Sequence, residues 1–153
     1  MTIKKLTKID ADDVWQVRNA AILAGCANVY DAKTLDIWTP EETPTGFAEL
    51  VQRGFYGIEI DDELVAVGML DEETDKIEGL FVLPEYMGQK LGGCMLQHLE
   101  QLARERGINT LSLDASLNAA DFYQHCGYQV VRHETYHSPA GISLPSVLMT
   151  KQL

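Results

Sequence analysis

The sequence predicts an α/β (α+β) fold in a single domain over residues 1–153, with a mixed, mostly antiparallel central sheet flanked by helices. A chain of 153 residues has the length of one compact domain. The middle of the chain holds three strand-like segments joined by short acidic turns, which favours an antiparallel meander. From about Lys90 onward, segments with helical and with strand periodicity alternate. The predicted order of elements is β-α-α-β-β-β-α-β-α-β-β.

The first third of the chain is predicted to hold one strand and two helices. Residues 3–9 alternate imperfectly and indicate a strand. A helix is expected from the N-cap Asp10 to Gly25. A second helix is expected over 39–54, because Thr39-Pro40-Glu41-Glu42 supplies a cap, a first-turn proline and an acidic first turn. The stretch 26–38 fits no pattern well enough to be assigned.

Three strands follow in the predicted meander. Residues 55–60 alternate between apolar and polar, and residues 64–70 are apolar on both faces, as in a buried central strand. The third strand, over 76–83, ends before a proline. Tight acidic turns at 61–63 and 71–75 connect the three.

The remaining elements alternate between helix and strand. Leu91, Met95, Leu99 and Leu102 lie on one face of a helix that Gly107 ends. A short helix over 118–126 is followed by Gly127, a typical helix-ending residue. Strands are expected over 110–115, 128–136 and 145–151.

The charge balance limits the kinds of partner. The chain carries 12 Lys and Arg against 23 Asp and Glu, a formal net charge of −11. A nucleic-acid binder needs a basic face that neutralises phosphates, so we expect no nucleic-acid partner. A cationic partner is easier to attract electrostatically, although the same charge can serve solubility alone.

No membrane partner is expected, because no apolar run approaches the ~20 residues of a membrane span. The first residues alternate rather than forming an apolar block, so no signal peptide is expected. Cys26, Cys94 and Cys126 are widely spaced and odd in number, unlike a disulfide framework or a zinc site. These features favour a reducing, cytoplasmic location.

The segment 82–93 joins the end of a strand to a long helix through a glycine-containing turn. The first amides of that helix have no intrahelical acceptor, and with the helix dipole they form an anion site suited to a pyrophosphate. Gly88, Gly92 and Gly93 would let a ligand approach the backbone closely. A tight turn without a ligand is the alternative. The segment is neither a Walker A loop nor a dinucleotide-binding fingerprint.

Together with residues 116–128, this segment resembles the GCN5-related N-acetyltransferase family. Residues 82–93 correspond to the family's Val-x-Pro-x-Tyr strand end and pyrophosphate turn. Asn118-Ala-Ala-Asp-Phe-Tyr123 corresponds to its Asn-Ala-x-x-Phe-Tyr pattern, and the resemblance covers essentially the whole chain. The turn departs from the family, because Met87 stands where relatives carry Gln or Arg and Lys90 where they carry a glycine.

The resemblance implies an acetyl-CoA-dependent N-acetyltransferase that needs no metal. Acetyl-CoA, the co-substrate, would lie in a V-shaped opening between the strands 76–83 and 110–115. Tyr123 would protonate the departing thiolate, and the Val82 N–H would polarise the thioester carbonyl. Glu78 would take the proton of the attacking amine, directly or through water. The implied coenzyme A-binding residues are Phe81, Val82, Gly88, Gln89, Lys90, Gly92, Gly93, Asn118 and Tyr123.

Simpler structural roles stay open for these residues. Tyr123 could only pack beside Phe122, and Asn118 is expected to cap the helix 118–126. Glu78 could be a solvated strand-end glutamate. On a regular strand it would share a face with the apolar Leu80 and Val82, which would raise the pKa of its carboxyl group.

The expected acceptor is a primary amine of a small molecule or peptide, cationic in keeping with the net charge. Tyr30, Trp38 and Phe47 are candidates for the walls of its pocket. Two other functions stay open: a non-catalytic acyl-CoA-binding or sensor module on the same fold, and an acidic protein-interaction domain. A homodimer also stays open.

The segment His133-Glu134-Thr-Tyr-His137 matches a zinc-binding pattern, but we expect no metal there. That pattern works on a helix, where residues four apart share a face. Residues 128–136 alternate as a strand, and four residues of strand span ~13 Å. Two ligands so far apart cannot share one zinc ion with bonds of ~2 Å.

Overall fold

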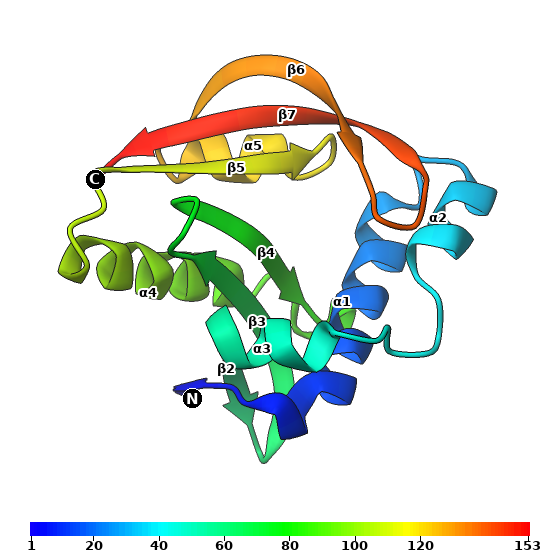
Figure 1. Cartoon of the computed structure of the whole chain (residues 1–153), viewed down its shortest axis with the longest axis horizontal. Coiled ribbons are helices and arrows are strands. Elements are labelled where there is room, and N and C mark those ends of the chain that lie inside the picture. The colour runs from blue at the N-terminus through cyan, green and yellow to red at the C-terminus, as the bar shows by residue number, and fades with distance from the viewer.

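The computed structural model describes residues 1–153 as one seven-stranded sheet with helices on both faces (Figure 1). The strands are β1 (Thr2–Lys5), β2 (Phe55–Ile60), β3 (Glu63–Asp71), β4 (Lys76–Val82), β5 (Thr110–Ser116), β6 (Gln129–His137) and β7 (Ser143–Gln152). The helices are α1 (Ala11–Cys26), α2 (Ala32–Trp38), α3 (Phe47–Gly54), α4 (Leu91–Glu105) and α5 (Ala120–His125), with short 3₁₀ turns η1 (Lys8–Asp10) and η2 (Pro84–Tyr86). None of the helices is long and apolar enough to cross a bilayer.

The sheet consists of two antiparallel halves joined by one parallel contact. Its strand order is β1-β2-β3-β4-β5-β7-β6. Strands β4 and β5 run parallel, and their ladder contains the single pair Lys76↔Ser112. Beyond that pair the two strands diverge, so the sheet is split at its centre (Figure 1).

Two main apolar clusters hold the layers together. On one face, α1 and α3 pack on the sheet through residues such as Val14, Val51 and Val67. On the other face, α4 packs through Met95 and Leu99. Each of these side chains is at most 1% exposed, so both faces of the central strands are sealed from water.

The predicted meander is confirmed. Strand β2 has the expected bounds, β3 is longer than expected by one residue at each end, and β4 is shorter by one residue at its end. Residues 65–71 of β3 are all buried, as the two-sided apolar pattern predicts. Asp61 and Asp62 both have positive φ, which fits the left-handed conformation of a tight hairpin turn.

The strand predicted over 3–9 is wrong beyond Lys5. Leu6 turns inward and is fully buried, which ends the alternation. Asp10 is the N-cap residue of α1, as expected, but its side chain makes no capping hydrogen bond to that helix. Its carboxylate instead accepts a hydrogen bond from the Thr7 amide at 2.8 Å. The side chain therefore belongs to the 3₁₀ turn η1 that precedes α1.

The helix predicted over 39–54 begins at Phe47 instead. Thr39 ends the preceding helix α2, donating from Oγ1 to the Leu35 carbonyl at 2.7 Å. A helix starting at Thr39 would also place Pro44 in its interior, where proline has no N–H to donate. The helix α2 itself lies in the stretch left unassigned. Its N-cap Asp31 accepts from the Thr34 amide at 2.7 Å, a capping pattern visible in the sequence.

In the second half, the helix over 91–105, the short helix and the last three strands lie where the sequence places them. Strand β7 is longer than expected and begins at Ser143. The short helix α5 begins at Ala120, and its N-cap is Ala119 rather than Asn118. The fold class is confirmed, with one more helix than predicted.

The close approach of β3 to α4 predicts a stability difference between two glycines. A Cβ atom on Gly68 would lie 2.7 Å from Met95 Cγ, so Gly68→Ala is expected to lower the free energy of unfolding by about 1–3 kcal/mol. A Cβ atom on Gly93 would meet nothing within 4 Å, and Gly93→Ala should raise it by about 0.5–1 kcal/mol. Urea denaturation measures both, and equal effects would contradict the packing described here.

Candidate functional site

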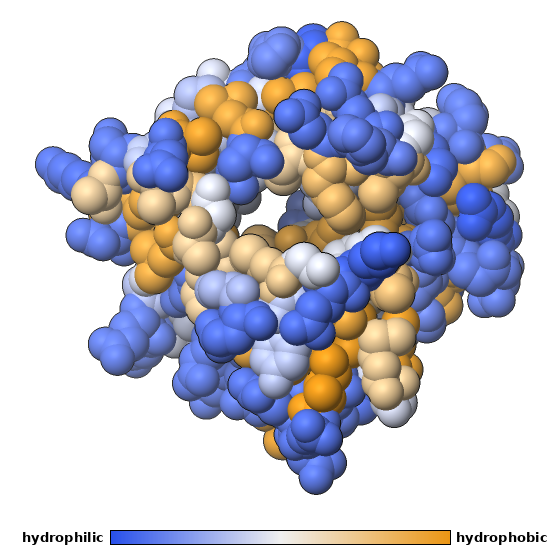
Figure 2. Space-filling view, turned by 180° about the vertical axis from the view of Figure 1, so that it is seen from behind, coloured by the Kyte–Doolittle hydropathy of each residue, from blue (hydrophilic) through white to orange (hydrophobic).

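A cavity of about 520 Å³ lies where β4 separates from β5. Of its 20 lining residues, 13 are hydrophobic, so it suits a ligand with an extended apolar part. Figure 2 shows the molecule hollowed at its centre, with hydrophobic residues on much of the wall. The lining comes from α1, Trp38 of α2, β4, the turn before α4, the start of α4, and the segment from Ser116 to Tyr123.

The backbone of β4 offers a free donor in this cavity. Leu83 donates its N–H to Val65 of β3 at 2.8 Å, and Val82 is paired with Ala66. Along an antiparallel ladder, bonded and non-bonded pairs alternate, so the Val82 N–H points away from β3. It faces the opening towards β5, where the parallel ladder has already ended.

The start of α4 supplies further donors in the wall of the same cavity. The first helical hydrogen bond runs from the Cys94 amide to the Lys90 carbonyl at 3.1 Å, which leaves the amides of Leu91, Gly92 and Gly93 without helical acceptors. Gly88 and Lys90 both have positive φ, 82° and 66°. Position 90 therefore has a backbone that suits glycine, although it carries a lysine.

Tyr123 lies in the wall of the cavity with 8% of its surface exposed. Its ring packs between Phe122 and Tyr128, with centroid distances of 5.2 Å and 5.8 Å. The hydroxyl makes no hydrogen bond within the chain. Burial raises the pKa of Tyr123 above its ordinary value, so the hydroxyl keeps its proton at neutral pH.

Asn118 does not cap α5. Its Oδ1 instead accepts a hydrogen bond from Cys26 Sγ of α1 at 3.3 Å, across the cavity wall that both residues line. The contact joins α1 to the turn after β5. Burial raises the pKa of the Cys26 thiol, so this cysteine stays protonated and is a poor nucleophile.

Glu78 does not share the face of Leu80 and Val82, because β4 is not regular at this point. Met69 pairs with Gly79 and Leu70 with Ile77, so Glu78 is the extra residue of a β-bulge. Leu80 and Val82 pack towards α4. Glu78 lies in an exposed cluster of charges that includes Lys76 and Asp114.

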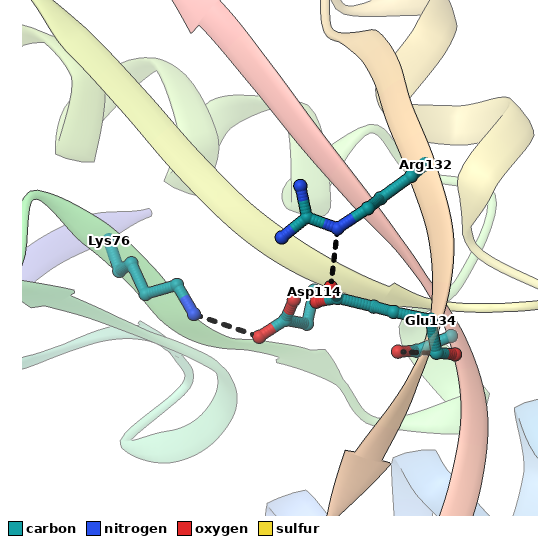
Figure 3. A network of polar contacts seen from close by, with 5 residues as sticks. Lys76, Asp114, Arg132 and Glu134 are labelled. Atoms are coloured by element: carbon teal, nitrogen blue, oxygen red, sulfur yellow. Dashed lines mark hydrogen bonds and ion pairs between the residues drawn. The ribbon is translucent and has the colours of Figure 1, made fainter.

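The polar cluster around Glu78 leaves its carboxylate without an ion pair. Lys76 pairs with Asp114 at 2.9 Å, and Arg132 pairs with Glu134 at 3.2 Å (Figure 3). Partial desolvation, offset by the charge of Lys76, raises the pKa of Glu78 above its ordinary value. A carboxylate with a raised pKa near a cavity can act as a general base.

The cavity wall contains most of the residues expected from the sequence. Phe81, Val82, Gly88, Lys90, Gly92, Gly93, Asn118 and Tyr123 line it, whereas Gln89 and Glu78 do not. Among the expected wall aromatics, Trp38 lines it. Tyr30 instead donates to the Pro145 carbonyl at 2.7 Å, and Phe47 packs against Trp15 with centroids 4.9 Å apart.

Sequence reasoning missed the wall formed by α1. Ala21, Ile22, Gly25 and Cys26 follow one face of that helix and line the cavity. Their helical spacing was visible, but a buried face does not show which part of it meets a cavity. No group of three or more His, Cys, Asp or Glu residues could hold a metal ion.

A second hollow, of about 410 Å³, lies beside the turn after α4. One of its seven lining residues is hydrophobic. Two others, Arg106 and Glu72, form an ion pair with each other at 2.7 Å. It contains none of the free amides described above and shares no residue with the central cavity.

Comparison with known proteins identifies relatives of this chain. Residues 23–128 match the family described as "Acetyltransferase (GNAT) family". The uncharacterised protein YyaT of Bacillus subtilis is 34% identical over 80 residues, which is 52% of this chain and 51% of that protein. A putative acetyltransferase of the same organism is 34% identical over 79 residues. The chain spans about half the length of the curated relatives it matches.

Solved structures share the fold over almost the whole chain. A GCN5-related N-acetyltransferase from Rhodopseudomonas palustris is 27% identical with a TM-score of 0.90, covering 99% of this chain and 95% of that one. The PaiA N-acetyltransferase from Thermoplasma acidophilum, in complex with coenzyme A, has a TM-score of 0.81 at 20% identity, covering 99% of this chain and 98% of that one.

Proposed function

The chain belongs to the acetyltransferase (GNAT) family, and on that premise we propose that it is an acetyl-CoA-dependent N-acetyltransferase. It transfers the acetyl group to a primary amine of a small molecule or peptide by direct attack. The observation that carries this proposal is one apolar cavity with free backbone donors in its wall, the Val82 N–H and the first amides of α4.

The residues present fit coenzyme A chemically. The amides of Leu91, Gly92 and Gly93 lie at the positive end of a helix dipole and suit the pyrophosphate. The apolar wall suits the pantetheine arm, and the Val82 N–H faces the opening where it would bind the thioester oxygen. The PaiA N-acetyltransferase, which shares this fold, is in complex with coenzyme A in its structure.

Two side chains are proposed to move protons. Glu78 lies outside the cavity wall, so it takes the proton of the attacking amine through water rather than directly. Tyr123, which is protonated at neutral pH and has a hydroxyl without a partner, protonates the thiolate as it leaves. The attack forms the new amide bond and breaks the thioester bond, and free coenzyme A departs as the thiol.

Three further statements stay predictions. These are the cationic character of the acceptor, the homodimer and the cytoplasmic location. The two alternative functions give different results. A non-catalytic acyl-CoA-binding module would bind acetyl-CoA but release no thiol with any amine. An acidic interaction domain would not bind acetyl-CoA.

Acetyl-CoA is expected to raise the melting temperature. A ligand that binds only the folded state at 100 times its Kd stabilises that state by about 2.7 kcal/mol, which is roughly 5–10 °C for a chain of this size. Differential scanning fluorimetry measures the shift, and thiol release with a panel of amines then tests turnover. Acetyl phosphate, which lacks the pantetheine arm, is the control. No shift with millimolar acetyl-CoA contradicts the proposed function.

The left-handed backbone and the charge at Lys90 predict different coenzyme A affinities for two substitutions at this position. Lys90→Gly removes a cation but relieves the αL conformation, so coenzyme A affinity should change little and the fold should gain about 1 kcal/mol. Lys90→Glu places a repelling charge beside the pyrophosphate and should raise the Kd roughly 5- to 30-fold. Lys33→Glu, on the exposed side of α2, is the charge-matched control in calorimetry. If Gly and Glu variants bind equally well, residue 90 does not face the phosphates.

Tyr123→Phe is expected to lower kcat by ~10²–10⁴-fold and to leave acetyl-CoA affinity nearly unchanged. The hydroxyl acts on the leaving thiolate, so its contribution grows in the transition state. Since the hydroxyl has no partner in the chain, the fold should survive. Tyr56→Phe, on β2 outside the cavity wall, is the control in the same steady-state assay. Unaltered turnover in Tyr123→Phe would remove this residue from the mechanism.

The raised pKa of Glu78 predicts a pH dependence. The base must be deprotonated, so the ratio of wild-type to Glu78→Gln kcat/KM should fall as the pH decreases through that pKa. The titration of the acceptor amine affects the wild type and the variant equally, so it cancels in this ratio. Glu42→Gln, at an exposed position before α3, should track the wild type. A ratio that does not vary between pH 5 and 9 would show that Glu78 is not the base.

A further inference from the structure

Arg18 of α1 is a half-buried cation without an acidic partner. Its Nη1 donates to Asn19 Oδ1 at 2.7 Å and to the Trp38 carbonyl at 3.1 Å. Its guanidinium lies 4.2 Å from the Trp15 ring centroid and 5.9 Å from that of Trp38. Both rings fix its position, while Nε and Nη2 keep donors for which the chain supplies no acceptor.

This situation is unusual in a chain with a formal net charge of −11. Arg53, Arg106 and Arg132 all pair with carboxylates. Arg104 is unpaired but exposed. Burial lowers the pKa of Arg18 to about 10, and the single titratable group that offsets this effect is the Tyr136 hydroxyl rather than a carboxylate. The chain therefore keeps a desolvated positive charge that it does not neutralise itself.

Arg18 lies one helix turn before the part of α1 that lines the central cavity, and it is not itself in the wall. Ala21 and Ile22, which line the cavity, follow it by three and four residues and so lie on the same helix face, one turn further on. Trp38 contacts Arg18 and also lines the cavity. The free amides of α4 lie in the wall formed by other elements, so Arg18 has no part in the proposed pyrophosphate site.

Tyr136 of β6 is half-buried, and the charged groups in its neighbourhood are Glu78, Arg18, Asp114 and Lys76. Lys76 and Arg132 are already paired with Asp114 and Glu134 (Figure 3), so they are not free to bind an anion. Around Tyr136, the free groups are thus one carboxylate, Glu78, and one guanidinium, Arg18.

We propose that Arg18 binds a carboxylate of the acceptor, so that the acceptor is an amine that also carries a carboxylate, as a free amino acid does. This inference rests on the proposed function and specifies its substrate class. The planar guanidinium fork binds a carboxylate through two parallel hydrogen bonds, which the unused Nε and Nη2 can supply. The amine of the same acceptor is the group that loses its proton to Glu78 through water in the proposed function.

The test compares amines that differ only in the carboxylate. With saturating acetyl-CoA, kcat and KM are measured for pairs of acceptors. Each pair consists of a free amino acid and the amine that remains when its carboxylate is removed. Examples are phenylalanine with phenethylamine, leucine with isoamylamine, and tyrosine with tyramine. The wild type should favour the carboxylate-bearing member. Arg18→Gln should raise its KM roughly 10- to 100-fold, the factor typical of lost hydrogen bonds to a charged group, and leave kcat nearly unchanged.

Matched variants separate binding from a structural effect. Arg18→Lys keeps the charge but not the fork, so its KM should lie between those of the wild type and Arg18→Gln. Arg104→Gln removes an exposed arginine and should change neither member of a pair. Loosening of Trp15 or Trp38 in Arg18→Gln would affect both members equally, and that result would overturn the proposal.

Two outcomes distinguish this inference from the proposed function. A wild-type protein that binds acetyl-CoA but neither binds nor acetylates any carboxylate-bearing amine, or that treats both members of each pair alike, contradicts the inference and leaves the proposed function standing. A protein that does not bind acetyl-CoA contradicts the proposed function itself.

Discussion

The parting of β4 and β5 after a single paired residue is the constraint on which the rest of this structure depends. A sheet that continued its ladder here would bond the Val82 N–H to β5 and close the central cavity. β4 has a bulge at Glu78, and β5 pairs fully with β7 along its other edge but with β4 at one residue only, so a backbone donor of β4 is left facing an apolar space. The buried faces of β3 and α4 keep this opened sheet rigid.

Both backbone amides and side chains line the opening. The start of α4 and the end of β4 offer amides, which any residue except proline can supply. This explains how Met87 and Lys90 can stand in a turn where relatives carry other residues. Trp38 of α2 lines the cavity, and it contacts Arg18 of α1. In a chain of net charge −11, this contact places an unpaired positive charge beside one wall residue.

The sequence predicted the meander, the helix α4 and most of the cavity wall, because these depend on local periodicity and on two contiguous segments. It did not predict the bulge at Glu78, since one extra residue in a strand leaves the apolar pattern almost unchanged. It placed a cap at Asn118, because an asparagine before a short helix is a good cap. Its contact with Cys26 joins residues 92 positions apart, and no local pattern reports such a contact. Pro44 could have excluded the helix start at Thr39.

Hydrogen exchange with saturating acetyl-CoA tests most directly whether the opening between β4 and β5 is the binding site. The Val82 amide and the first amides of α4 lack partners within the chain's own ladders, so they should exchange fast in the free protein and slowly in the complex. Mass spectrometry should show this protection in peptides covering residues 80–94, and none in those covering the polar hollow at 72–75 and 106–110. Unchanged exchange over residues 80–94 in a saturated protein would contradict the account.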